Sequence, residues 1–181
     1  MSALARLLVL IFPLYAFDAL AAGRSHESMP GSGANEAADV GLVDMAGKVT
    51  NLESHTGDGK WLVVMVWSVT CGVCAREVPV YSVFHDEHKD RDIKVLGVAL
   101  DGYAQRNAIE STMKQWDMRF PTLVAEVGVF AFNYELATGE RLMGTPTFMV
   151  YTPQGELVAN NPGPMRTSAL VDYIARYEGR Q

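Results

Sequence analysis

The sequence predicts a single α/β domain, built on a mixed β-sheet with helices around it. The chain has 181 residues, of which 49% are hydrophobic, enough for one domain with a core but short for two. Short apolar stretches rich in β-branched residues alternate with stretches of helical period, as in βαβ units with parallel strands. Near the C-terminus, a Pro-Gln-Gly turn separates two further apolar stretches and predicts an antiparallel pair.

The first 21 residues have the pattern of an export signal. Arg6 gives a positive start, the apolar stretch 7–17 follows, and Ala19-Leu20-Ala21 is a cleavage pattern of small residues. The apolar stretch is shorter than the ~20 residues that a membrane-spanning helix needs, which favours a cleaved signal over an uncleaved anchor. We therefore expect the protein in the periplasm, with an anchor in the inner membrane facing the periplasm as the alternative.

Composition changes after the signal. Residues 22–38 are rich in Gly, Ser and Ala and have no apolar period, so they are predicted to be a flexible linker. The folded domain is predicted to occupy residues 39–181. The net charge is −6 and no run of basic residues occurs, which argues against binding to nucleic acid.

The domain is predicted to begin with a β-hairpin over residues 40–52. Seven consecutive apolar residues at 61–67 fit a strand that is covered on both faces. Residues 74–90 have apolar positions at helical spacing and predict an amphipathic helix. The remaining strands are predicted at 93–100, 121–124, 147–151 and 157–160, and the remaining helices at 108–116, 129–134 and 168–177.

The two cysteines, Cys71 and Cys74, are only three positions apart. A structural disulfide framework in an exported protein normally has more cysteines, placed far apart to close large loops. A bridge over two intervening residues restrains the unfolded chain very little. The pair is therefore expected to serve chemistry.

The pair lies between a buried strand and a helix, which places Cys71 at the N-terminus of the helix. The unpaired N–H groups and the helix dipole favour a thiolate there, and such thiols have pKa values lowered from ~8.5 to roughly 3.5–7.5. Cys71 is predicted to be the attacking sulfur, and Cys74, one turn further along and less exposed, the resolving sulfur. On one helical face, positions i and i+3 bring the two sulfurs within bonding distance.

Two other readings of the pair are an inert buried bridge and half of a zinc site. A four-ligand zinc site needs a second pair of ligands. His85 and His88 are spaced i, i+3, but they are expected on a solvated helix face, and no metal site or cofactor is predicted. The other histidines are His26 and His55.

Several features together are typical of a known family. Trp67 lies four residues before the first cysteine, Glu77 and Pro79 follow the second, and Gly144-Thr145-Pro146 precedes a strand. On these residues and the cysteine pair, the segment 39–178 resembles the thioredoxin superfamily, in particular the exported TlpA/ResA-like thiol–disulfide oxidoreductases. The resemblance implies a thioredoxin-like fold with an N-terminal β-hairpin and a βα insertion.

The resemblance also implies roles for individual residues. Pro146 would have a cis peptide bond and lie against the disulfide, and the backbone of Thr145 could pair with a substrate strand. Trp67, like Trp61 and Trp116, is expected to pack in the core or at its rim, and it would also flank the redox pair and contact substrate. Glu77 would tune or shuttle protons for the buried thiol, since the position of the thioredoxin aspartate is Met65 here.

The chain departs from the family pattern in three places. Thr70 stands where a Trp usually precedes the first cysteine, and Gly72-Val73 contains no proline. The two residues between the cysteines strongly affect the reduction potential, which ranges from about −270 to −120 mV in such proteins. The segment 135–143 is also expected to be a longer link than usual.

The predicted function is reduction of disulfides in exported proteins by Cys71, with resolution by Cys74. By resemblance, the substrates include apocytochrome c or copper-site proteins awaiting metal. The periplasm lacks a reducing thiol buffer, so a membrane thiol reductant is the expected electron donor. Disulfide formation, the reverse reaction, is one alternative. A copper chaperone or binding module using both thiolates is another, and a peroxidase is less favoured.

Overall fold

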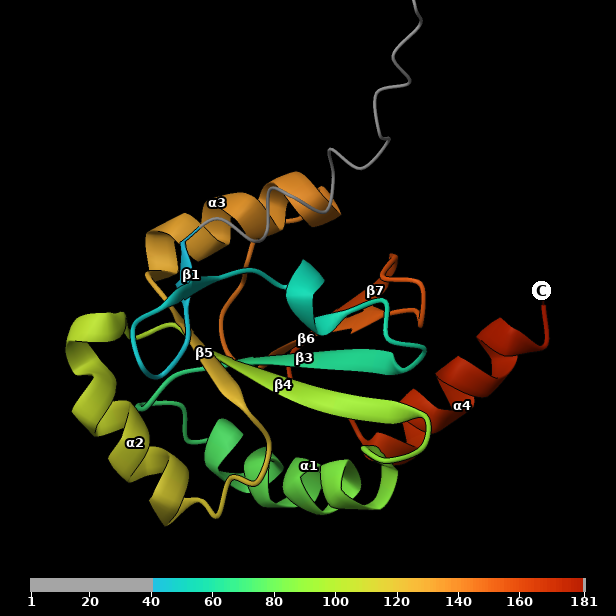
Figure 1. The fold of residues 1–181 in the computed structure, drawn as a ribbon, viewed down its shortest axis with the longest axis horizontal. Helices are drawn as coiled ribbons and strands as arrows, with labels where there is room; N and C mark the ends of the chain where they lie inside the picture. Colours follow the sequence, from blue (N-terminus) through green and yellow to red (C-terminus); the bar gives the residue numbers. More distant parts are fainter. Residues whose placement is uncertain (1–40, 181) are drawn as a thin grey trace, which may run out of the picture. The chain divides into compact units, whose positions relative to one another are not determined.

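The computed structural model describes residues 41–180, which form a seven-stranded mixed sheet with helices on both faces (Figure 1). The predicted signal peptide (1–21) and linker (22–38) lie outside the described residues. The strand order is β2-β1-β5-β4-β3-β6-β7. The α/β class and the thioredoxin-like arrangement predicted from the sequence are confirmed.

The strands are bounded as follows: β1 Leu42–Val43, β2 Val49–Thr50, β3 Trp61–Trp67, β4 Ile93–Ala99, β5 Thr122–Ala125, β6 Thr147–Tyr151 and β7 Leu157–Pro162. The three central strands β3, β4 and β5 pair in parallel, and the outer pairings are antiparallel. Parallel neighbours need crossover connections, and the helices between these strands provide them.

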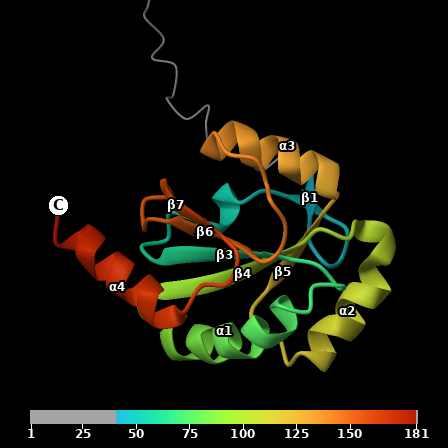
Figure 2. The ribbon, with the colours of Figure 1, turned by 180° about the vertical axis from the view of Figure 1, so that it is seen from behind.

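The helices are α1 Cys74–His88, α2 Arg106–Gln115, α3 Val127–Thr138 and α4 Thr167–Glu178, with short 3₁₀ turns η2 Glu53–His55 and η3 Tyr103–Gln105. Figures 1 and 2 show α3 on one face of the sheet and α1 and α4 on the other. None of the helices within residues 41–180 has both the length and the apolar character needed to span a bilayer.

The predicted strands agree with the structure to within about two residues, but α3 is longer than the predicted 129–134. It continues to Thr138 and ends where Gly139 adopts a left-handed φ of 72°. A glycine in this conformation is a common helix stop because it lacks a Cβ. The segment 135–143, expected as one long link, is therefore partly helical.

Strand β3 forms the centre of the core, and all seven of its residues are buried. Alternate side chains point to opposite faces of a strand. Met65 and Trp67 pack in a cluster with residues of α1, α2 and α4, such as Val78. Val64 and Val66 pack on the other face in a cluster that includes Phe130 of α3.

His85 was expected on a solvated helix face, and this expectation was wrong. Only 8% of its surface is exposed, and its Nδ1 accepts the backbone N–H of Val95 at 3.0 Å. Burial, the largest cause, lowers the pKa of His85 and favours the neutral ring that can accept this bond. The side chain ties α1 to β4.

Two phenylalanines provide a matched test of the core. Phe148 of β6 is fully buried and stacks on Tyr81 at 4.7 Å, whereas Phe132 of α3 is 64% exposed. We expect Phe148→Ala to lower the free energy of unfolding by about 3–5 kcal/mol, because it leaves a cavity in the core. Phe132→Ala should change it by less than about 0.5 kcal/mol. Urea denaturation of both variants measures the difference, and equal effects would contradict this placement of the core.

Candidate active site

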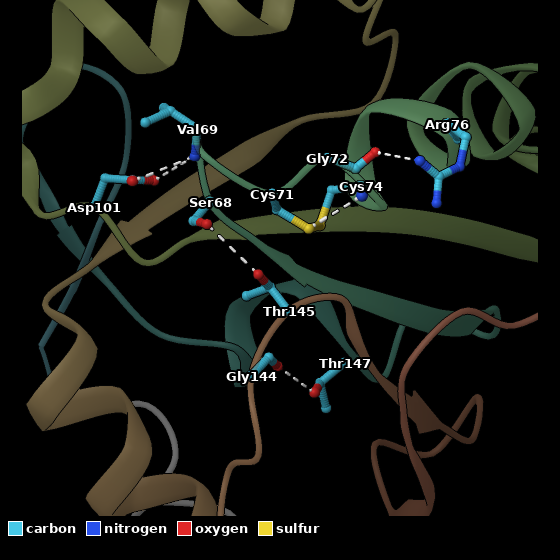
Figure 3. Close-up of a disulfide and its surroundings, with 10 residues drawn as sticks. All are labelled: Ser68, Val69, Cys71, Gly72, Cys74, Arg76, Asp101, Gly144, Thr145 and Thr147. Atoms are coloured by element: carbon cyan, nitrogen blue, oxygen red, sulfur yellow. Dashed lines mark hydrogen bonds between the residues drawn. A yellow bond between two sulfur atoms is a disulfide. The ribbon is translucent and has the colours of Figure 1, made fainter.

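A tight turn after β3 carries the two cysteines. The backbone N–H of Cys71 donates to the carbonyl of Ser68 at 3.0 Å, which closes the turn, and α1 begins at Cys74. Cys71 and Cys74 form a disulfide (Figure 3). The carbonyl oxygen of Cys71 accepts the N–H of Ala75 and so takes part in the hydrogen bonds of the first helical turn.

The Cys71 carbonyl accepts the Ala75 N–H as in a first helical turn and the two sulfurs are bonded, as the spacing predicted, although Cys71 itself precedes the first residue of α1. The turn nevertheless directs its sulfur at the helix terminus, because the backbone N–H of Cys74 donates to Cys71 Sγ at 3.0 Å. This donor and the positive end of the helix dipole favour a thiolate at Cys71 once the disulfide is reduced.

The two sulfurs differ in accessibility. Cys71 is 8% exposed and Cys74 is fully buried. Cys74 is thus the less exposed of the two, as the sequence predicted from the order of the pair. Cys74 Sγ is in contact with Cys71 Sγ, to which it is bonded.

Arg76 is a charged neighbour that the sequence analysis did not single out. Its guanidinium donates to the carbonyl of Gly72 at 3.0 Å, which holds a positive charge over the turn between the two cysteines (Figure 3). A cation beside a thiol is one of the arrangements that lower its pKa. Its position four residues after Gly72, about one helical turn along, is the signal that could have identified it.

The second segment of the site is the cis-Pro loop, residues 144–147. The Thr145–Pro146 peptide bond is cis, and Pro146 is buried. The hydroxyl of Thr147 donates to the carbonyl of Gly144 at 2.7 Å and closes the loop. Ser68 Oγ lies 3.5 Å from Thr145 Oγ1, so the loop and the cysteine turn are in contact beside the disulfide (Figure 3).

The expectation that Trp67 contacts substrate was wrong. Its side chain is fully buried and packs against Trp116 with ring centroids 5.5 Å apart. The buried Nε1 of Trp67 has no hydrogen-bond partner among the described residues. Trp67 is the last residue of β3, and its burial fixes the point from which the cysteine turn departs.

Met65 and Glu77 occupy the two positions at which an acid near the cysteines was considered. Met65 is fully buried in the same core cluster as both cysteines, so no acid occupies this strand position. Glu77 is half-buried in the first turn of α1. Burial, and secondly the charge of Glu77, raise the pKa of Tyr81, whose hydroxyl donates to the carbonyl of Met165 at 2.8 Å.

Asp101 is a second charged residue that the sequence analysis missed. Both of its carboxylate oxygens accept the backbone N–H of Val69, at 3.1 and 3.3 Å (Figure 3). Burial raises the pKa of this carboxyl, and the bond from Val69 opposes the shift. Because β3 and β4 are parallel and Trp67 pairs with Ala99, the residues that follow the two strands meet at one sheet edge. The parallel arrangement of these strands was predicted from the sequence, and it is the signal that could have identified Asp101.

The arrangement can carry out thiol–disulfide exchange with the chain's own two sulfurs. Within residues 41–180, no three His, Cys, Asp or Glu side chains are grouped closely enough to hold a metal ion.

Comparisons with known proteins place this chain in a family. Residues 34–160 match the AhpC/TSA family. The thiol-disulfide oxidoreductase ResA of Bacillus thuringiensis subsp. konkukian is 23% identical over 141 residues, covering 78% of this chain and 76% of that protein. A secreted Mycobacterium tuberculosis disulfide oxidoreductase homologous to E. coli DsbE superposes with a TM-score of 0.59 at 20% identity, covering 78% and 98% of the two chains. StoA from Bacillus subtilis superposes with a TM-score of 0.57 at 21% sequence identity, covering 74% of this chain and 94% of that chain.

Asp101 gives a pH-dependent prediction. Its raised pKa means that the folded protein holds the proton more tightly than the unfolded chain, so ionisation of Asp101 lowers stability as pH rises. Asp101→Asn lacks this ionisation and keeps an oxygen that can accept the Val69 N–H. We expect the unfolding free energy of the wild type, relative to Asp101→Asn, to fall as pH rises from about 4 through the raised value.

Denaturant titrations at several pH values measure this difference, which should become constant above the raised pKa. Asp172→Asn on the exposed side of α4 controls for loss of one surface charge. A difference that grows with pH would contradict the prediction, because it would mean that the folded state favours the ionised carboxylate.

Proposed function

The chain belongs to the AhpC/TSA family, and on that premise we propose that it is a thiol–disulfide oxidoreductase that reduces disulfides in exported proteins. One observation carries the proposal. The slightly exposed Cys71 sulfur accepts a helix N–H and is bonded to the fully buried Cys74. This is the asymmetry that a two-step exchange needs.

The reaction begins with both cysteines reduced. The Cys71 thiolate attacks one sulfur of the substrate disulfide, forms a mixed disulfide and releases the other substrate sulfur as a thiolate. The Cys74 thiolate then attacks Cys71 Sγ, which breaks the mixed disulfide and releases the second substrate sulfur. Two electrons pass to the substrate, its two thiolates take up protons, and the Cys71–Cys74 disulfide remains.

The cis-Pro loop is the proposed contact for the substrate backbone. Pro146 has no N–H, so the loop presents the polar groups of Thr145 beside the disulfide. Their contact with Ser68 keeps them next to the cysteine turn. An extended substrate segment that pairs with Thr145 would present its own sulfur to Cys71.

Glu77 is the proposed proton-tuning residue for Cys74. It lies three residues after Cys74 in the first turn of α1, where its carboxylate can take up or release a proton as the buried sulfur changes its charge. Fully buried Met65 supplies no alternative acid from the central strand.

We propose export to the periplasm, with residues 1–21 as a cleaved signal peptide, 22–38 as a linker and 39–181 as the functional domain. The apolar stretch and small-residue pattern in the sequence support this division. The substrates are exported proteins with disulfides, among which apocytochrome c and copper-site proteins fit the resemblance. A membrane thiol reductant would restore the reduced pair.

The function is tested by trapping the mixed disulfide. We expect Cys74→Ser, expressed with its signal peptide, to accumulate mixed disulfides at Cys71, because the resolving sulfur is absent. Mass spectrometry of the trapped complexes identifies the partners. Cys71→Ser is the matched control and should trap nothing, since Cys74 is fully buried.

An exported Cys74→Ser variant that traps no protein would contradict attack by Cys71 on proteins. Equilibration of the wild type with defined glutathione ratios then fixes the direction. A potential near about −120 mV, that of a strong oxidant, would overturn the reductase assignment in favour of disulfide formation.

Glu77→Gln tests proton tuning. A carboxylate close to a thiol disfavours the thiolate, so its removal should lower the higher of the two apparent thiol pKa values of the reduced protein by about one unit. Ultraviolet absorbance of the thiolates against pH measures both steps. Glu87→Gln, at an exposed position on the same helix, is the control and should leave both values in place. An identical titration of Glu77→Gln and the wild type would remove Glu77 from the mechanism.

A further inference from the structure

A hollow of about 440 Å³ lies at the end of α2, and none of its lining residues belongs to the cysteine turn or to the cis-Pro loop. Three of the chain's nine methionines line it: Met45, Met113 and Met118. Its other lining residues are Glu110, Lys114 and Asp117. We call this hollow the methionine pocket.

The fold brings the three methionines together from separate segments. Met45 lies in the turn after β1, Met113 in the last turn of α2, and Met118 in the link from α2 to β5. β1 and β5 pair antiparallel with Val43 opposite Val124, so the turn after β1 and the link before β5 meet at one end of the two strands. All three methionines are half-buried and pack against the same core cluster. They therefore converge on one partly enclosed place.

Hydrogen bonds hold the lining of the methionine pocket in position. The carboxylate of Asp44 accepts two backbone N–H groups of its own turn, each at 2.9 Å, which fixes the backbone around Met45. The carbonyl of Met113 accepts the N–H of Met118 at 2.9 Å, and Sδ of Met118 accepts the hydroxyl of Thr122 at 3.1 Å. A lining that is already ordered binds a ligand without the entropy cost of ordering it.

The donor atoms of the pocket determine which ligand it suits. A thioether is a soft, neutral ligand, and among metal ions such sulfurs select Cu(I). The two carboxylates are already paired, Glu110 with Arg106 at 3.7 Å and Asp117 with Arg119. A hard divalent ion, which needs several oxygen ligands, therefore has no free carboxylates to hold it here. Lys114 is exposed, so its flexible side chain can keep its charge in water.

From this arrangement we propose that the methionine pocket binds one Cu(I) ion through the thioether sulfurs of Met45, Met113 and Met118. Filling of gaps in a core explains methionines that are fully buried, such as Met65 and Met149. It does not explain three half-buried methionines around an open hollow. The site uses no thiol and changes the oxidation state of neither the copper nor the disulfide, so it goes beyond the proposed function and does not depend on it.

Titration of the oxidised full-length protein with Cu(I), supplied anaerobically as its acetonitrile complex, tests the proposal. The Cys71–Cys74 disulfide leaves no thiolate among the described residues to bind the metal. Carbon-13 labelling of the methionine methyl groups lets NMR report binding at each methionine. We expect the methyl signals of Met45, Met113 and Met118 to shift together and to stop shifting at one Cu(I) per chain.

Met113→Leu and Met118→Leu should each weaken the binding of Cu(I) by about tenfold or more. Changes in the residues that merely support metal ligands already cost about 10–100-fold in affinity, so loss of a ligand should cost at least as much. Leucine is close to methionine in volume, so both variants are expected to fold. Met143→Leu is the matched control, since Met143 is a 79% exposed methionine that does not line the pocket, and it should bind Cu(I) as the wild type does.

Methyl signals of the three methionines that do not move with Cu(I) would overturn the copper site, as would equal weakening of binding by Met143→Leu and Met113→Leu. The same shifts on addition of Zn(II) would also overturn it, because soft donors would then not be the basis of selection. Each of these results leaves the proposed function standing. An empty trap with Cys74→Ser would remove the proposed function and leave the copper site standing, because the titration uses the disulfide form.

Discussion

The structure of the site depends on the pairing of β3 with its two neighbours. β3 is buried along its whole length and pairs in parallel with β4 and antiparallel with β6. Trp67 pairs with Ala99 on one side, and Val66 with Thr147 on the other. Because these registers are fixed, the cysteine turn after β3, Asp101 after β4 and the cis-Pro loop before β6 must meet at one edge of the sheet.

Groups of both charges lie around the cysteine turn. The Cys74 N–H and the Arg76 guanidinium provide positive potential at the start of α1, where it favours a thiolate. Asp101, which holds the backbone of Val69, and Glu77 provide negative charge around the same turn. The charge around the cysteine turn is therefore a balance between groups of α1 and of the end of β4, and does not come from the helix terminus alone. Since neither carboxylate neighbours Cys71 in the sequence, the fold sets this balance.

Helix α3 covers one face of the sheet with some of its side chains and lines a hollow beside the redox site with others. Phe130 and Tyr134 pack into the core on the sheet face that α1 does not cover. Val127 and Ala131 line a hollow whose other lining residues include Ser68 and Thr145. Helix α3, which covers this face of the sheet, thus also lies beside the redox site.

The sequence by itself determined the elements and the chemistry. The unbroken apolar run 61–67 identified the buried strand, and the spacing of Cys71 and Cys74 identified the reactive pair, because both signals are local. The tertiary structure decided what depends on contacts between distant segments: that Trp67 is buried and not a substrate contact, that His85 holds β4, and that Asp101 holds the cysteine turn. Periodicity reports which face of an element is apolar, but only the packed sheet determines what that face meets.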